Sequence, residues 1–208
     1  MAATGTKTLT PIEAYSLLIK DMDTVRYKRV IDHSVNVGLL AGEISARCGL
    51  DRDYATVLGF IHDIGRKIDS KNHVYFGYRY LEELGYSDYS YICLTHSFLN
   101  NELDCVAGLP LGKDAPGYDF MLGYVRDRKY TLYDKIIQVC DLLCKDSGFT
   151  TLEDRLLDIE TRRGKTDKAG YHKKTAEKQM EDIERIMGCA IYSLYDRIKK
   201  PDYLLNIY

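Results

Sequence analysis

The sequence of 208 residues contains no tryptophan, only four prolines and no pair of cysteines in a C-x-x-C arrangement. Its six cysteines are scattered along the chain, which argues against a zinc ribbon and against a disulfide framework. We therefore interpret them as reduced thiols that pack as small apolar side chains. Cysteines of this kind are typical of a cytoplasmic protein, and we expect that location.

The sequence also lacks a long hydrophobic segment and an excess of charge of either sign. Its longest apolar run extends only from Ala55 to Ile61, far short of the ~20 residues that span a bilayer. Residues 1–7 contain no hydrophobic region of a secretory signal. A formal net charge of −2 provides no global field that attracts nucleic acid or an anionic membrane. We therefore expect no membrane partner, and nucleic acid is disfavoured as a partner.

The composition is that of an ordinary folded domain. Hydrophobic residues make up 45% of the chain and charged residues 29%, so there is enough apolar surface to form a core and disorder is excluded. A chain of this length predicts a single domain over 1–208, with its core at about 26–163 and a C-terminal helix packed on it. The sequence carries no signal for an oligomeric state.

Helical patterns dominate the chain, and no segment alternates as a strand does. A capping box with proline at the first helical position begins at Thr10, and Gly49 and Gly85 follow two periodic segments as C-caps. Between about 97 and 130, six glycines or prolines interrupt the pattern, which predicts one long irregular loop, a candidate substrate lid. The sequence therefore predicts an all-α helical bundle, with helices over about 11–22, 26–48, 51–64, 72–84, 87–96, 131–145, 151–163 and 175–199.

Four of the five histidines and two aspartates lie at helix ends or on apolar helix faces: His33, His62, Asp63, His73, His96 and Asp141. His33 shares a helix face with Val37 and Leu40, and Asp141 follows Ile137 by one turn, so both point inward. A buried carboxylate is costly unless it is paired, and a divalent cation held by imidazole and carboxylate removes that cost. Four imidazoles and two carboxylates exceed one tetrahedral site and suggest two metals that share a carboxylate.

The order of these residues resembles a known signature. His33, then His62-Asp63, then Asp141 is similar to the H…HD…D pattern of the HD-domain metal-dependent phosphohydrolase superfamily, and His73 and His96 resemble its branch with a binuclear site. The segments 73–77 and 133–141 are most similar to the symmetrical dinucleoside tetraphosphatase proteins. The resemblance covers about 26–163.

The resemblance implies a ligand set. One metal is held by His33, His62, Asp63 and Asp141, and a second by His73 and His96, with Asp63 bridging. It implies iron or manganese, with nickel, cobalt or magnesium as alternatives, and a metal-bridging hydroxide as nucleophile. Asp63, Arg66 and Lys67 are then the catalytic residues. Many binuclear members have lysine directly after His-Asp-Ile-Gly, where this chain has Arg66 before Lys67, and either cation could hold a phosphate.

These observations support a phosphohydrolase that cleaves a phosphoester or phosphoanhydride bond of a small nucleotide-like substrate. Three alternatives stay open: a mononuclear phosphatase in which His73 and His96 contact substrate, a nucleotide-sensing or structural module that binds metal without turnover, and an RNA-binding protein that uses the basic run 162–174. Arg155 follows the last ligand on the next helix, where it either approaches the metals or pairs with Asp158 or Glu160.

Overall fold

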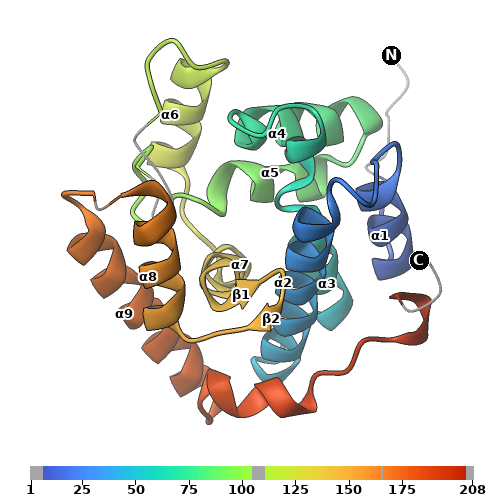
Figure 1. The fold of residues 1–208 in the computed structure, drawn as a ribbon, viewed down its shortest axis with the longest axis vertical. Helices are drawn as coiled ribbons and strands as arrows, with labels where there is room; N and C mark the ends of the chain where they lie inside the picture. Colours follow the sequence, from blue (N-terminus) through green and yellow to red (C-terminus); the bar gives the residue numbers. More distant parts are fainter. Residues whose placement is uncertain (1–6, 105–110, 165, 205–208) are drawn as a thin grey trace.

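Helices make up most of the computed structural model, which describes residues 7–104, 111–164 and 166–204 (Figure 1). The described helices, including three 3-10 helices (η), are α1 (Pro11–Ile19), α2 (Lys28–Arg47), α3 (Arg52–Ile61), η1 (Ile64–Lys67), α4 (His73–Leu84), α5 (Ser87–Thr95), α6 (Tyr118–Asp127), α7 (Leu132–Leu143), α8 (Leu152–Arg163), α9 (Ala169–Met187), η2 (Ile191–Arg197) and η3 (Asp202–Leu204). The expected all-α class is thereby confirmed. Its one departure in these ranges is a two-residue antiparallel pair, β1 (Cys144–Lys145) with β2 (Gly148–Phe149).

Helices α2 and α3 form the centre of the fold, and α7 packs against α2. The two central helices approach closely because glycines oppose each other: a Cβ added at Gly59 would lie 2.3 Å from the Cα of Gly38. Ile31, Leu40 and Phe60 are fully buried around this contact. The buried face of α2 therefore lies directly beside the C-terminal end of α3 and the middle of α7.

A second glycine contact joins η1 to α4. A Cβ at Gly65 would lie 2.0 Å from the carbonyl oxygen of His73 and 2.5 Å from the amide nitrogen of Gly77. Only the absence of a side chain permits this approach, because real Cβ atoms do not come so close to backbone atoms. The His73-x-x-x-Gly77 spacing therefore serves to dock α4 against the turn that follows α3, with His73 at the contact.

The segment expected to be one irregular loop over about 97–130 contains a helix, so that part of the prediction is wrong. Helix α6 begins after Gly117, which has φ +70, and its Met121 and Val125 are buried against aromatic residues of α4 and its own turns. The helix is short, with Gly117 at its start and Gly123 on its open side. The central part of this segment, 105–110, lies outside the described residues, as do 1–6, 165 and 205–208.

The C-terminal helix was predicted over 175–199 and instead occupies Ala169–Met187. It ends because Gly188 takes the left-handed conformation, with φ +72, and the chain continues as η2 rather than as a longer helix. Helix α7 likewise ends at Leu143, before the expected Lys145, because Cys144 is extended and pairs in β1. Helix α9 packs on α7.

The described residues bear on two expectations from composition, namely the state of the cysteines and the lack of a membrane-spanning segment. Cys48, Cys93, Cys140, Cys144 and Cys189 are all free thiols, as interpreted from their spacing; Cys105 lies outside these ranges. No helix in the described part of the chain combines the length and the apolarity that a membrane crossing requires.

Candidate metal centre

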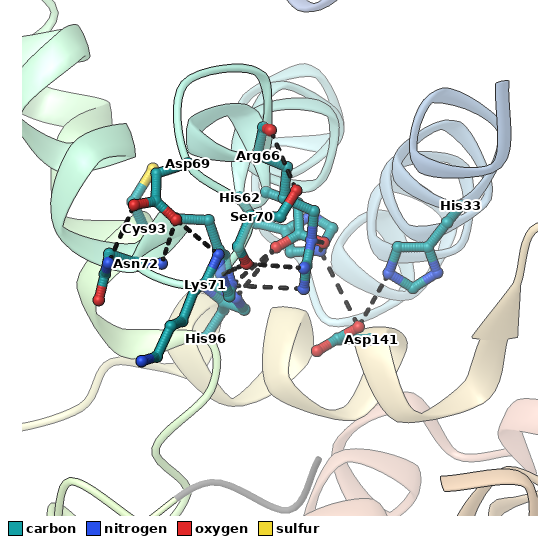
Figure 2. Close-up of polar contacts among 12 residues, drawn as sticks. His33, His62, Arg66, Asp69, Ser70, Lys71, Asn72, Cys93, His96 and Asp141 are labelled. Atoms are coloured by element: carbon teal, nitrogen blue, oxygen red, sulfur yellow. Dashed lines mark hydrogen bonds and ion pairs between the residues drawn. The ribbon is translucent and has the colours of Figure 1, made fainter. Parts of the chain in front are cut away.

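Five separate elements contribute side chains to one buried cluster (Figure 2). It consists of His33 from the middle of α2, His62 at the C-cap of α3 with Asp63 next to it, His73 as the first residue of α4, His96 at the C-cap of α5, and Asp141 from α7. The structure thus brings together all six residues that the sequence analysis named as ligands.

Imidazole nitrogens in this cluster face two carboxylates. At one end, Nε2 of His33 lies 2.9 Å and Nε2 of His62 lies 3.9 Å from Oδ1 of Asp141. At the other end, Nε2 of His73 lies 3.1 Å and Nε2 of His96 lies 3.5 Å from Oδ1 of Asp63. His62 lies between the two ends, because its Nε2 is also 3.7 Å from Oδ2 of Asp63. Two ligand groups share this central histidine.

Backbone carbonyls determine which ring nitrogen of three histidines carries the proton. Nδ1 of His62 lies 2.7 Å from the carbonyl oxygen of Gly59, Nδ1 of His96 lies 3.1 Å from that of Ile92, and Nδ1 of His73 lies 3.2 Å from that of Ser70. A carbonyl oxygen only accepts, so each Nδ1 must donate its proton. In the neutral ring the lone pair is then on Nε2, directed into the cluster, as in metal-binding histidines.

This donor set fits a divalent cation. Nε2 of His62 and Oδ1 of Asp63 are buried and make no hydrogen bond, although a polar atom left without a partner in the interior is costly. The ligand atoms form two groups, and within each group all of them lie within 4.8 Å of one another. One group is His33, His62 and Asp141, and the other is His62, Asp63 and His96. Imidazole nitrogen with carboxylate oxygen is a set that binds iron, manganese, zinc and similar ions. A cation would satisfy both orphaned atoms.

The protonation states of these groups suit metal binding. Burial lowers the pKa of His62 to about 4, so its ring is neutral at physiological pH. Burial alone would raise the pKa of Asp63, but the nearby Arg66 guanidinium and His73 hold it well below its usual value. For Asp141 the pKa is also lowered, because His33, His62 and His96 together outweigh the effect of burial. The site therefore offers ionised carboxylates and a neutral central imidazole.

The two candidate cations of the sequence analysis are placed differently. Arg66 reaches the cluster: its Nε donates to Oδ2 of Asp63 at 2.5 Å, and one of its terminal nitrogens lies 3.4 Å from Nε2 of His73. The ammonium of Lys67 instead donates to the carbonyl oxygen of Leu17 at 3.2 Å and to the hydroxyl of Tyr80 at 3.0 Å. The structure therefore places Arg66 and not Lys67 at the cluster, because successive residues of the η1 turn point to different sides.

Buried polar residues of α7 support the end of α5. Oγ1 of Thr95 donates to Asp134 at 2.7 Å, and Nε2 of Gln138 donates to the carbonyl oxygen of Thr95 at 2.9 Å. Thr95 immediately precedes His96, so these bonds from α7 hold the segment that carries the ligand. Gln138 had a signal in the sequence, because it is a polar residue between the apolar Ile137 and Val139 of α7.

The sequence of this chain is similar to a protein family and to several known proteins. The HD domain family model matches residues 30–146, which include every residue of the cluster. Ribonuclease Y of Lactobacillus helveticus is 40% identical over 57 residues, which cover 25% of this chain and 10% of that protein. Ribonuclease Y of Thermotoga maritima is 36% identical over 59 residues, which cover 26% of this chain and 12% of that protein. The chain thus spans about a tenth of the length of these relatives, and no solved structure matched it significantly.

Proposed function

Because this chain belongs to the HD-domain family of metal-dependent phosphohydrolases, we propose that it hydrolyses a phosphoester or phosphoanhydride bond of a small nucleotide-like substrate. One observation carries the proposal: imidazoles, oriented by backbone carbonyls, direct their Nε2 atoms at two ionised carboxylates in a buried cluster. Such a set is costly as a structural core and suited to holding cations that bind phosphate.

We propose two metal positions in this cluster. His33, His62 and Asp141 would hold one ion, and His73 and His96 the other, with Asp63 between them. This assignment is supported by two groups of ligand atoms, one around Asp141 and one around Asp63, which have His62 in common. Divalent cations, iron or manganese by family resemblance, would supply Lewis acidity and lower the pKa of water in the site.

The chain's own residues would bind and orient the substrate. Asp63 holds its charge at neutral pH and is 4% exposed, so it is positioned for ligation and shielded from water. The guanidinium of Arg66 lies at the same carboxylate and is 24% exposed, so it can turn toward an incoming phosphate. We assign Arg66 to phosphate binding and leave Lys67 out of the site. The single-domain organisation over 1–208 and the cytoplasmic location stay predictions.

A substrate panel tests this function. Protein loaded with Fe²⁺ or Mn²⁺ is incubated with nucleoside mono-, di- and triphosphates, dinucleoside polyphosphates and a short single-stranded RNA, and released product is measured beside the Asp63→Ala variant. We expect turnover of a nucleotide by the wild type and a loss of at least about 100-fold in the variant, since even residues behind metal ligands cost 10–100-fold when replaced. Bound metal without turnover of any compound would overturn the proposal in favour of a sensing or structural module.

RNA is included in the panel because of the two relatives described above, whose printed name is ribonuclease. A near-neutral chain gives RNA no extended basic field, and the basic run 162–174 is engaged in part with acidic neighbours: Lys168 pairs with Glu102 and Asp104, and Arg162 pairs with Asp158. We therefore place RNA behind nucleotides. Elemental analysis of the purified protein distinguishes one metal from two, and a single ion per chain at full activity would contradict the binuclear assignment.

A further inference from the structure

Only a few side chains of the metal centre are exposed to solvent. His62, His96 and Asp63 are at most 5% exposed, whereas the side chain of Asp141 is 24% exposed. Arg155, from the first turns of α8, lies beside this exposed carboxylate, with a terminal nitrogen 4.0 Å from its Oδ1. An anion that approaches the Asp141 end of the cluster therefore meets Arg155.

The guanidinium of Arg155 is largely buried and poorly satisfied. Its side chain is 15% exposed, yet its Nε is buried and makes no hydrogen bond. Its other contact is a long one, 3.4 Å from a terminal nitrogen to Oδ2 of Asp158. Arg162 already binds that same carboxylate oxygen at 2.7 Å. A charged group held in this way costs free energy, and an additional acceptor would recover it.

We propose that Arg155 binds a phosphate oxygen of the substrate at the Asp141 end of the centre, opposite Arg66. This rests on the proposed function. The guanidinium is planar and carries five donors, so it can keep its contact with Asp158 while it donates to a phosphate. Its distance of 4.0 Å from Asp141 is too long for a hydrogen bond between the two, and leaves that nitrogen available to the ligand.

Charge supports a phosphate as the ligand. The carboxylates of Asp63 and Asp141 are offset by the guanidinium groups of Arg66 and Arg155. Any divalent cation held by the cluster therefore makes it electropositive, with an arginine at each carboxylate. Two arginines flanking such a centre match an oxyanion with several terminal oxygens, as a phosphate group has.

The test is binding of inorganic phosphate to Mn²⁺-loaded protein, measured by isothermal titration calorimetry, with metal content and thermal unfolding of every variant. Arg155→Met keeps the apolar stem and removes the donors, Arg155→Lys keeps the charge without the planar fork, and Arg162→Ala is the matched control at the same Asp158. We expect wild-type metal content throughout, phosphate affinity about 10- to 100-fold lower for Arg155→Met, partial recovery for Arg155→Lys, and less than a twofold change for Arg162→Ala. If Arg155→Met does not fold, Arg155→Lys carries the test, with at least a threefold loss expected.

Unchanged phosphate affinity in Arg155→Met would overturn the inference, because the arginine would then be only an ion-pair partner of Asp158. Loss of metal from that variant would overturn it as well, because Arg155 would then position Asp141 for the metal. Failure of the proposed function is distinct: wild-type protein with metal bound neither binds phosphate nor hydrolyses any compound. If the wild type turns over a substrate and Arg155→Met has the same kinetics and phosphate binding, only the role of Arg155 is excluded and the proposed function stands.

Discussion

Nε2 of His33 lies 2.9 Å from Oδ1 of Asp141, although the two residues belong to α2 and α7, far apart in the sequence. An imidazole nitrogen and an ionised carboxylate both present lone pairs, so this contact requires a proton or a metal cation between them. A metal ion held by these two residues would replace that proton, so metal binding at the cluster would be coupled to pH and to folding.

Metal loading should stabilise the protein. We expect Mn²⁺ at about 100 times its dissociation constant to add roughly 2.7 kcal/mol, because the ion binds the folded chain and satisfies the orphaned atoms of His62 and Asp63. At roughly 2–4 °C per kcal/mol for a chain of this size, Tm should rise by about 5–11 °C. Differential scanning fluorimetry with chelator or with Mn²⁺ measures this. His62→Ala should remove most of the shift, and an equal shift in that variant would exclude the proposed ligand.

Gly65→Ala should damage the site through the backbone. The added Cβ would meet the carbonyl oxygen of His73 at 2.0 Å, so η1 or the start of α4 must move. We expect a loss of about 1–3 kcal/mol in unfolding free energy, as for overpacking elsewhere, together with weaker metal binding. Chemical denaturation and metal titration measure the two effects. Gly123→Ala is the control, since nothing lies within 4 Å of its added Cβ and alanine favours the helix; an equally large effect there would contradict the explanation.

Arg66 and Lys67 should differ in their effect on turnover. Arg66→Ala should lower kcat/KM by about 10- to 100-fold, because it removes the charged donor at Asp63. Lys67→Met should change kcat/KM less than threefold, because its ammonium bonds to Leu17 and Tyr80, away from the cluster. Steady-state kinetics on the substrate that the panel identifies measures both. A Lys67 variant as impaired as the Arg66 variant would show that η1 rearranges when substrate binds.

Lys67 should also make stability depend on pH. Its pKa falls to about 8, mainly because of burial, against an ordinary value of 10.5. Between these values the unfolded chain holds more protons than the folded one, so the wild type gains stability as pH rises through this window. Relative to Lys67→Met, the free energy of unfolding of the wild type should therefore increase from pH 8 to 10. Urea denaturation across that range measures the difference, and a constant or falling difference would contradict the burial of the ammonium.

The helices around the site could be predicted from local signals, and the tertiary contacts could not. Helix α7 begins at Leu132, next to the predicted start at 131, and Thr131 and Asp134 form its capping box. Helix α6 was not predicted, because a short amphipathic segment between glycines has too few turns to show a helical period. The C-terminal helix ends earlier than predicted because Gly188 terminates it, although the polar helical pattern continues beyond that residue.

The sequence by itself determined which six residues are the candidate ligands, because each is a metal-binding type at a helix end or on an apolar face, and the order along the chain resembles one family. Only the tertiary structure decided which positively charged side chains lie next to these candidate ligands. Arg66 and Lys67 are adjacent, yet the η1 turn sends one to Asp63 and the other to Leu17. Arg155 reaches Asp141 only because α8 packs on α7. Helical periodicity is a local property of the chain, whereas the direction of a side chain at a turn and the contacts between helices depend on how distant segments pack.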